Sequence, residues 1–504
     1  NTILLFLALA FIFSEKADGQ PVNLSKAAIV ASTGIKQPVR ETFIRVLQEE
    51  VLQRTGINLP EAIHSGKANI VLATANDKEI NGMIVPKRQG ENLAENKAEG
   101  FRMVMESQAE KQILWLIGAD ERGVLYALGQ FLRTAELTKG KIIFDKQNEI
   151  ASAPVSSIRG HQVGYRNTAN SWDSWTSSQF DKYFRELALL GANSIENIPF
   201  QDGPRGPNMK YSYEEMNLRL SEICNKYKLD YWVWLPVDVD LSDKTKFDAE
   251  VKRHAEYYQA TPRLDGIFIP GGDPGRNHPK YLMPFLKAIA SELKKYHPKA
   301  GVWLSLQKFN NEEVDYFYRY IDENRPEWFA GVVSGPGSPD MAETRYRLPK
   351  QYKHRSYPDV THNVRCQFPV TGWDQAFALT EGREMCNPRP IYYSKIHNRF
   401  APFTDGFISY SDGSHDDVNK AVWSQMGWDP EKPVQQVLEE YARFFFGPTG
   451  AKNIAEGILA LEHNWTGPAE ENGSIATTLA YWQNLEMKHP ELKGNWRWQQ
   501  LVMR

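Results

Sequence analysis

The sequence has few cysteines and no excess of charge of either sign. Its 504 residues include three cysteines, Cys224, Cys366 and Cys386, and no two of them form a Cys-x-x-Cys pair. This low, odd count excludes a disulfide framework, and the missing pair argues against a thiolate zinc site. Lys and Arg total 59 against 62 Asp and Glu, a net charge of −3. Nucleic-acid binders usually show a basic excess, so no nucleic-acid partner is expected.

Long apolar runs are also missing, except at the N-terminus. Residues 3–13 read ILLFLALAFIF, a run of signal-peptide length that is too short to span a bilayer. Small residues at Ala17 and Gly19 follow, at the spacing of a cleavage site. We therefore expect residues 1–19 to be a signal peptide clipped at its start. The mature protein is then periplasmic or secreted and does not bind a membrane. A short buried helix is the alternative interpretation.

The remaining composition is that of a globular chain with many aromatic residues. Hydrophobic residues make up 41% and charged residues 24%, which excludes a disordered chain and a polytopic membrane protein. The 14 Trp, 22 Tyr and 24 Phe suit a large core and also sugar-stacking surfaces. Residues 20–150 combine short apolar strand patterns with a helix pattern at 41–52 and another at 120–134. They predict a small α+β domain without obvious chemistry.

Between residues 155 and 430 a strand, a loop and, in most cases, a helix pattern recur eight times. The expected strands are 157–165, 193–197, 231–238, 266–272, 301–307, 330–335, 354–362 and 406–412. Eight alternating units over roughly 275 residues are typical of a (β/α)8 TIM barrel, within the α/β class. A doubly wound open sheet is the alternative. Residues 431–504 read as a helical C-terminal region that stops inside an amphipathic pattern, so we expect it to be truncated.

Active sites of such barrels form at the carboxyl ends of the strands, so polar residues there are the candidates. Asp273 follows strand four in a glycine-rich turn, Glu196 ends strand two, and Asp412 ends strand eight. These three are the predicted catalytic residues, with Asp238 after strand three as a weaker candidate. Each has a structural alternative: Asp273 could cap a turn, and Glu196 could be the partner of a neighbouring arginine.

The predicted sugar-binding residues lie at the same strand ends. Arg166 could hold a substrate carboxylate by two parallel hydrogen bonds. The others are polar or aromatic side chains near the expected mouth: His161, His278, Gln307, Trp373 and Tyr410. Arg159, within strand one, needs a carboxylate partner, and a structural ion pair at the barrel floor is an even alternative to a functional role. No metal-ligand spacing such as HExxH is present, so neither a metal nor a cofactor is expected.

Several short motifs resemble known glycoside hydrolases. Residues 117–128, IGADERGVLYAL, resemble the end of the N-terminal domain that precedes the barrel in family 67 alpha-glucuronidases and family 20 beta-hexosaminidases. Residues 158–160 resemble the start of the family 67 barrel, and 191–196 are similar to a second strand of related families. Trp428-Asp429-Pro430 and 439–450 resemble the barrel end of family 115 alpha-glucuronidases. The resemblance implies an exo-acting glycoside hydrolase with a carbohydrate partner and no cofactor.

The sequence departs from these families after strand four. Family 20 enzymes carry an Asp-Glu pair there, whereas Asp273 is followed by Pro274. Family 67 enzymes place a Glu acid after the same strand, so the acid here would have to be Asp273 or another residue. The leading hypothesis is an alpha-glucuronidase-like hydrolase of plant or host polysaccharides. A beta-N-acetylhexosaminidase-like enzyme is the second, and a non-catalytic carbohydrate-binding barrel is the third.

Overall fold

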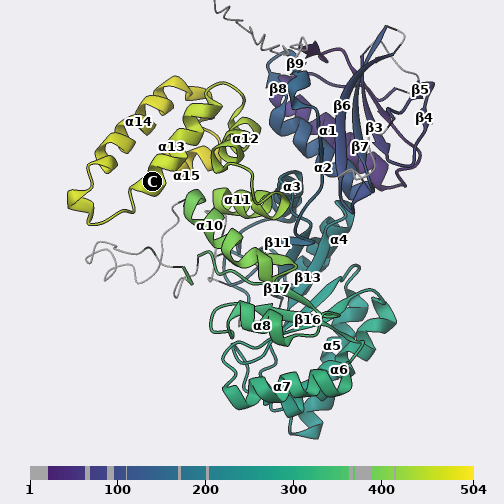
Figure 1. Ribbon diagram of the computed structural model, residues 1–504, viewed down its shortest axis with the longest axis vertical. Helices are drawn as coiled ribbons and strands as arrows, with labels where there is room; N and C mark the ends of the chain where they lie inside the picture. Colours follow the sequence, from purple (N-terminus) through teal and green to yellow (C-terminus); the bar gives the residue numbers. More distant parts are fainter. Residues whose placement is uncertain are drawn as a thin grey trace, which may run out of the picture.

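The computed structural model describes residues 21–62, 68–87, 96–108, 110–167, 172–199, 204–361, 367–368, 370, 388–411, 413 and 416–503. Within these ranges the chain forms a mixed sheet with helices, a closed barrel and a group of C-terminal helices (Figure 1). The described helices include none that is long and apolar enough to cross a membrane.

The N-terminal part is built on a five-stranded sheet with the order β10-β6-β7-β3-β2. Its strands are β2 (Ala28–Ala31), β3 (Ala68–Thr74), β6 (Phe101–Gln108), β7 (Lys111–Gly118) and β10 (Ile150–Ser152). The smaller strands are β1 (Val22–Asn23), β4 (Glu79–Ile80), β5 (Met83–Ile84), β8 (Glu136–Thr138) and β9 (Lys141–Phe144).

Two helices accompany this sheet, α1 (Val39–Thr55) and α2 (Glu121–Thr134). Asp120 caps α2, because its side chain accepts a hydrogen bond from the backbone N–H of Gly123. The apolar face of α2 predicted from helical spacing is buried in the core; it comprises Val124, Leu125, Leu128, Phe131 and Leu132. The sheet with its helices confirms the α+β fold expected for the N-terminal part.

Eight parallel strands close into a barrel in sequence order. They are β11 (Ile158–Gln162), β12 (Ser194–Asn197), β13 (Asp230–Trp234), β14 (Gly266–Pro270), β15 (Gly301–Ser305), β16 (Phe329–Ser334), β17 (Lys353–Ser356) and β18 (Gly406–Ser409). Each expected strand is present, and pairing of β11 with β18 closes the sheet. The TIM barrel is therefore confirmed, and the open-sheet alternative is excluded.

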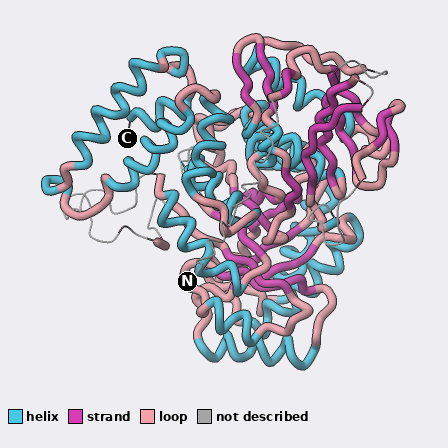
Figure 2. The backbone as a smooth tube through the Cα atoms, turned by 45° about the horizontal axis from the view of Figure 1, so that its top comes forward, coloured by secondary structure: helices cyan, strands magenta, loops and turns pink. Residues whose placement is uncertain are grey.

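Helices surround the barrel (Figure 2). They are α3 (Ser177–Leu189), α4 (Tyr213–Lys226), α5 (Lys244–Ala260), α6 (Pro279–Tyr296), α7 (Asn311–Asn324), α8 (Met341–Arg347), α10 (Pro390–Phe400) and α11 (Asp417–Trp428). The sixth and seventh positions hold the short helices α8 and α10. Side chains alternate along each strand, so one set fills the barrel interior and the other packs under the helices.

The interior set is largely aromatic and aliphatic. It forms one buried cluster that includes Trp232, Trp234, Phe268, Trp303 and Ile408. Trp232 and Trp234, two residues apart on β13, both pack in this core. After the barrel, α12 (Val434–Phe446), α13 (Ala451–His463), α14 (Ser474–Lys488) and α15 (Trp496–Met503) share a second core with α11.

Arg159 joins the barrel to the N-terminal sheet. Its guanidinium is fully buried and its Nη2 lies 2.6 Å from an oxygen of Glu99, in the loop before β6. Glu99 also pairs with Arg122 of α2, at 2.8 Å. The carboxylate partner expected for Arg159 is therefore present, and it is a structural partner between two parts of the fold rather than a site residue.

Candidate active site

Two strands of the barrel deliver an aspartate to the mouth at the same offset. Asp273 and Asp359 each stand three residues after the last residue of their strand, β14 and β17, and in the sequence Asp412 follows β18 at the same spacing. Asp359 is nearly buried and lies in register with Tyr410 at the ends of β17 and β18. Asp412 lies outside the described residues. The mouth therefore has carboxylates on strands four and seven within the described part of the chain.

Below the mouth, four side chains form one hydrogen-bonded chain inside the barrel. Arg355 of β17 donates from Nη2 to Oε2 of Glu196 on β12. The other oxygen of Glu196 accepts from Nε2 of Gln162 at 2.7 Å. Oε1 of Gln162 in turn accepts from the phenol of Tyr357 at 2.9 Å. Arg355, Glu196 and Gln162 are fully buried, whereas Tyr357 is partly exposed. The chain thus runs from the sealed interior to the mouth.

Burial raises the pKa of Glu196 above its ordinary value, although the Arg355 charge and the Gln162 hydrogen bond oppose the rise. Arg355 is covered by aromatic rings rather than by further acceptors. Its guanidinium carbon lies 4.9 Å from the ring centres of both Trp232 and Phe268. Nε and Nη1 have no hydrogen-bond partner among the described residues. Glu196 is therefore its one carboxylate contact in that part of the chain.

This geometry revises the role predicted for Glu196. Its carboxyl group is fully buried and both its oxygens are engaged inside the barrel. A scissile bond could reach it only if Gln162 and Arg355 moved. The structural alternative, a partner for an arginine, is the arrangement that the structure has.

Tyr357 is the centre of the polar mouth. Its ring centre is 5.5 Å from that of Phe268 and 6.3 Å from that of Tyr410. Tyr410 accepts a hydrogen bond from Nη1 of Arg166 at 3.3 Å, so Arg166 lies at the mouth as predicted from its strand position. Asp359 and Arg166 both act electrostatically on the Tyr357 phenol, whose pKa burial raises. These residues come from strands one, four, seven and eight.

Strands four and five supply the exposed rim. Asp273 is 37% exposed, and its carboxylate lies 2.9 Å from Nζ of Lys308. Gln307 is nearly buried, with Oε1 accepting from Ser305 and Nε2 donating to the Pro336 carbonyl at 2.8 Å. A Cβ placed on Gly335 would stand 2.9 Å from Cδ1 of Tyr357 and 3.3 Å from Nε2 of Gln307. Gln307 and Tyr357 therefore flank the same glycine.

Two of the predicted histidines do not line the mouth. His161 faces away from the barrel interior. Its ring nitrogens lie 2.8 Å from the hydroxyls of Ser409 and Ser424, on the side where α11 packs. Burial, aided by Lys420, holds its pKa well below the usual range, so it is a neutral packing residue and not a sugar ligand. His278 caps α6 and lies 2.9 Å from Glu312, at the outer edge of the rim. Trp373 lies outside the described residues.

Four mouth residues were not singled out from sequence: Arg355, Tyr357, Asp359 and Lys308. Arg355 is a charge inside a strand pattern, the same signal that drew attention to Arg159. Asp359 has the strand offset of Asp273, which becomes visible only once the end of β17 is fixed at Ser356. Tyr357 and Lys308 carried no distinguishing signal.

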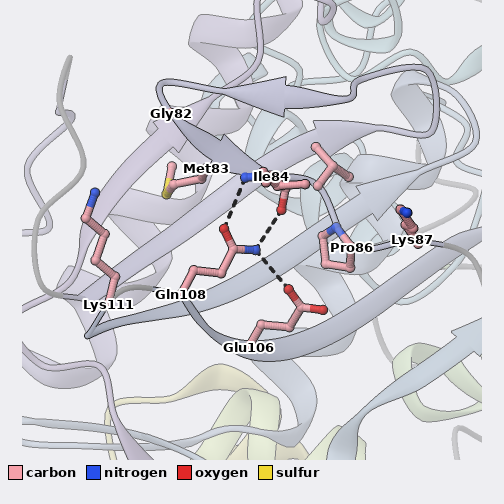
Figure 3. A pocket seen from close by; sticks show the side chains of 9 residues that line it. Gly82, Met83, Ile84, Pro86, Lys87, Glu106, Gln108 and Lys111 are labelled. Carbon is pink, nitrogen blue, oxygen red and sulfur yellow. Dashed lines mark hydrogen bonds between the residues drawn. The ribbon is translucent and has the colours of Figure 1, made fainter.

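A cavity of about 440 Å³ lies elsewhere, in the N-terminal part (Figure 3). It is lined by β5, the chain after it, and β6. Gln108 donates to the carbonyl of Ile84 at 2.7 Å and accepts from its N–H at 3.1 Å, and it also bonds Glu106. The Gln108 amide is thus satisfied by its neighbours in the lining. Across the described residues, no group of three His, Cys, Asp or Glu side chains is placed to hold a metal.

Comparison with known proteins confirms the fold relationship. No family model matches the chain, and no curated protein matches it. Among solved structures, a beta-hexosaminidase from Streptomyces plicatus has a TM-score of 0.55 at 11% identity, over 86% of this chain and 93% of its own. A family GH115 4-O-methyl-alpha-glucuronidase with specificity for decorated arabinogalactans has a TM-score of 0.61 at 13% identity, over 95% and 70%.

A family 89 glycoside hydrolase from Clostridium perfringens is similar over 90% of this chain and 59% of its own, with a TM-score of 0.55 and 10% identity. The resemblance to families 20 and 115 read from short motifs is thus confirmed in the architecture. At these identities the likeness concerns the fold, and the chemistry has to be argued from the mouth itself.

Proposed function

We propose that this protein is a secreted, exo-acting glycoside hydrolase of the alpha-glucuronidase type, which cleaves O-glycosidic bonds of plant or host polysaccharides. The observation that supports this most is the mouth of the barrel, where aspartates follow strands four and seven at one offset around a central tyrosine. Glycosidases of three families share this architecture, which adds support from the fold.

The reaction needs two carboxyl groups across the scissile bond. One gives a proton to the leaving oxygen, and the other activates water or attacks the sugar. We propose Asp273 as one member, because its carboxylate is exposed at the rim and accessible to substrate. The second member is Asp359 or Asp412, which stand at the equivalent offset on neighbouring strands. Glu196 then supports the site from below instead of reacting.

Arg166 is the residue proposed to favour a uronic acid. It is half-buried at the mouth, and its guanidinium bonds the Tyr410 hydroxyl at 3.3 Å. A guanidinium recognises a carboxylate by paired hydrogen bonds, and Lys308 adds a second cation across the mouth. A hexosaminidase-like activity on N-acetyl sugars is the second candidate, favoured by the 93% coverage of the Streptomyces enzyme.

A hydrolysis screen of the purified protein tests the proposal. The probes are 4-nitrophenyl glycosides, including the alpha-glucuronide and the N-acetyl-beta-glucosaminide, together with glucuronoxylan fragments. Asp273→Asn is expected to lower kcat by about 10²- to 10⁴-fold, as removal of an acid or base does. Asp322→Asn is the matched control, since Asp322 is an exposed aspartate paired with Arg325 on α7.

Release of glucuronic acid that Asp273→Asn abolishes and Asp322→Asn retains supports the proposal. Release of N-acetylhexosamine instead moves the substrate to the second candidate. Sugar binding without turnover of any probe would overturn both and leave a carbohydrate-binding barrel.

A further inference from the structure

The hydrogen-bond chain beneath the mouth, formed by Arg355, Glu196, Gln162 and Tyr357, has its donors and acceptors in a fixed order. The Arg355 guanidinium, fully buried, needs a counter-charge, and its one carboxylate contact in the described chain is Glu196. An ionised carboxylate can only accept hydrogen bonds, so Gln162 must present its NH2 group to Glu196. Its carbonyl oxygen then faces Tyr357, and the phenol must donate to it. The charge at Glu196 thereby sets the orientation of every group above it.

This direction matters because Tyr357 is the exposed end of the chain. Gln162, Glu196, Arg355 and the ring of Phe268 beneath it are all 0% exposed. Tyr357 is partly exposed, and it touches residues from several strands, including Tyr410. Its ring is therefore a surface that a bound sugar would meet, and within the described residues its hydroxyl makes one hydrogen bond, to Gln162.

We propose that Glu196 and Gln162 are positioning residues, which act through a one-way hydrogen-bond chain to hold Tyr357 as the substrate-contacting floor of the mouth. The inference rests on the proposed glycoside hydrolase function for its substrate class, a pyranoside. It assigns no reacting role to Glu196. Tyr357 is the group that touches the sugar.

Exchanging the side chains of Glu196 and Gln162 tests the direction of the hydrogen bonds. In Glu196→Gln, the new amide satisfies Arg355 with its oxygen and turns its NH2 to Gln162. The Gln162 amide must then flip, so its NH2 group donates to the Tyr357 oxygen and the phenol proton is free to point into the mouth, where a sugar meets a donor in place of an acceptor. In the double variant Gln162→Glu with Glu196→Gln, the carboxylate at position 162 accepts from both neighbours. Tyr357 donates again, and every bond of the original chain has a partner.

The expected kinetic result is loss in the single variants and recovery in the exchange. Tyr357→Phe and Glu196→Gln each lower kcat/KM on the hydrolysed 4-nitrophenyl glycoside by about tenfold, the scale of one hydrogen bond. Their combination loses little more than either alone, because both act on the same Tyr357 hydroxyl. The exchange variant returns to within about threefold of wild type, well inside that loss.

Tyr352→Phe is the matched control. Tyr352 lies immediately before the first residue of β17, at the end away from Tyr357. It is buried, and its hydroxyl donates to the Pro326 carbonyl at 3.1 Å. It loses a phenol hydroxyl from the same part of the chain, and we expect kcat/KM to stay at the wild-type value. Wild-type kinetics in Tyr357→Phe would overturn the inference. So would an exchange variant as slow as Glu196→Gln.

Crystal structures separate this inference from the proposed function. If the wild-type protein hydrolyses no glycoside, the proposed function fails, but the hydrogen-bond chain from Arg355 to Tyr357 can still be examined. The Tyr357 ring should be displaced in Gln162→Ala, which removes the hydrogen-bond partner of its hydroxyl, and should keep its wild-type position in the exchange variant. An unmoved Tyr357 in Gln162→Ala would overturn the inference whatever the activity.

Discussion

Two buried arginines on strands of the same barrel have opposite surroundings. Arg159 of β11 donates from all three of its nitrogens, to the Gly191 and Ser156 carbonyls at 2.8 Å and to Glu99 at 2.6 Å. Within the described part of the chain, Arg355 of β17 donates only from Nη2, and aromatic rings lie against its guanidinium. Both guanidiniums are fully buried. The difference therefore lies in how completely each is satisfied.

Their carboxylate partners differ in the same way. Burial raises the pKa of Glu99, but the charges of Arg159 and Arg122 outweigh it, and the net pKa lies below the ordinary 4.5. Glu196 has one guanidinium, and burial leaves its pKa above 4.5. The fully satisfied pair joins two parts of the fold. The sparsely satisfied pair lies under the mouth, where incomplete satisfaction is a mark of function more than of stability.

The largest expected difference is between Arg159→Met and Arg355→Met. Arg159→Met should lower the free energy of unfolding by about 3–5 kcal/mol, because it takes one of two guanidinium partners from a buried carboxylate and leaves two buried carbonyls without their donor. Arg355→Met should cost less, about 1–3 kcal/mol, since one hydrogen bond is lost and Glu196 can take up a proton. Urea unfolding measures both.

Activity should rank these two variants the other way. At temperatures where both are folded, Arg159→Met keeps its kcat/KM and Arg355→Met does not. Equal stability losses, or activity lost in Arg159→Met alone, would contradict the division into a structural and a functional cluster.

A substitution at Gly335 acts on the mouth cluster alone. A Cβ there would come within 2.9 Å of the Tyr357 ring and 3.2 Å of its backbone oxygen, so Gly335→Ala must displace Tyr357. We expect a loss of about 1–3 kcal/mol from overpacking, together with a rise in KM. Gly473→Ala is the control, because nothing lies within 4 Å of a Cβ at that glycine. An unchanged KM in Gly335→Ala would remove Tyr357 from the substrate surface.

The smallest effect is a difference in pH dependence. Glu99 has a depressed pKa, so the stability it contributes is present above 4.5 and is lost as pH falls below 4.5. Glu196 has a raised pKa, so the folded protein binds its proton first, and stability rises as pH falls from 7 to 4.5.

Unfolding free energies of wild type, Glu99→Gln and Glu196→Gln at pH 7, 4.5 and 3.5 check this. The advantage of wild type over Glu196→Gln should grow from pH 7 to 4.5, and its advantage over Glu99→Gln should shrink from 4.5 to 3.5. The opposite signs of these two changes are the expected outcome. Slopes of the same sign would contradict the comparison.

The sequence was sufficient for the barrel because most strands, such as β14 and β15, are apolar runs followed by polar residues, and the eight strand patterns repeat in order. It could not reveal that Glu196 meets Arg355, because 159 positions separate them and only closure of the barrel brings them together. His161 and Gln162 show a different limit. Adjacent residues on a strand face opposite sides, so one of them packs under a helix and the other enters the barrel.

A crystal structure of the Asp273→Asn protein soaked with 4-nitrophenyl alpha-glucuronide tests the central claim most directly. The account predicts a sugar at the carboxyl ends of the strands, resting on Tyr357, with its carboxylate near Arg166 and its glycosidic oxygen near the side chain at position 273. A sugar bound only outside the barrel, such as in the N-terminal cavity of Figure 3, would contradict it.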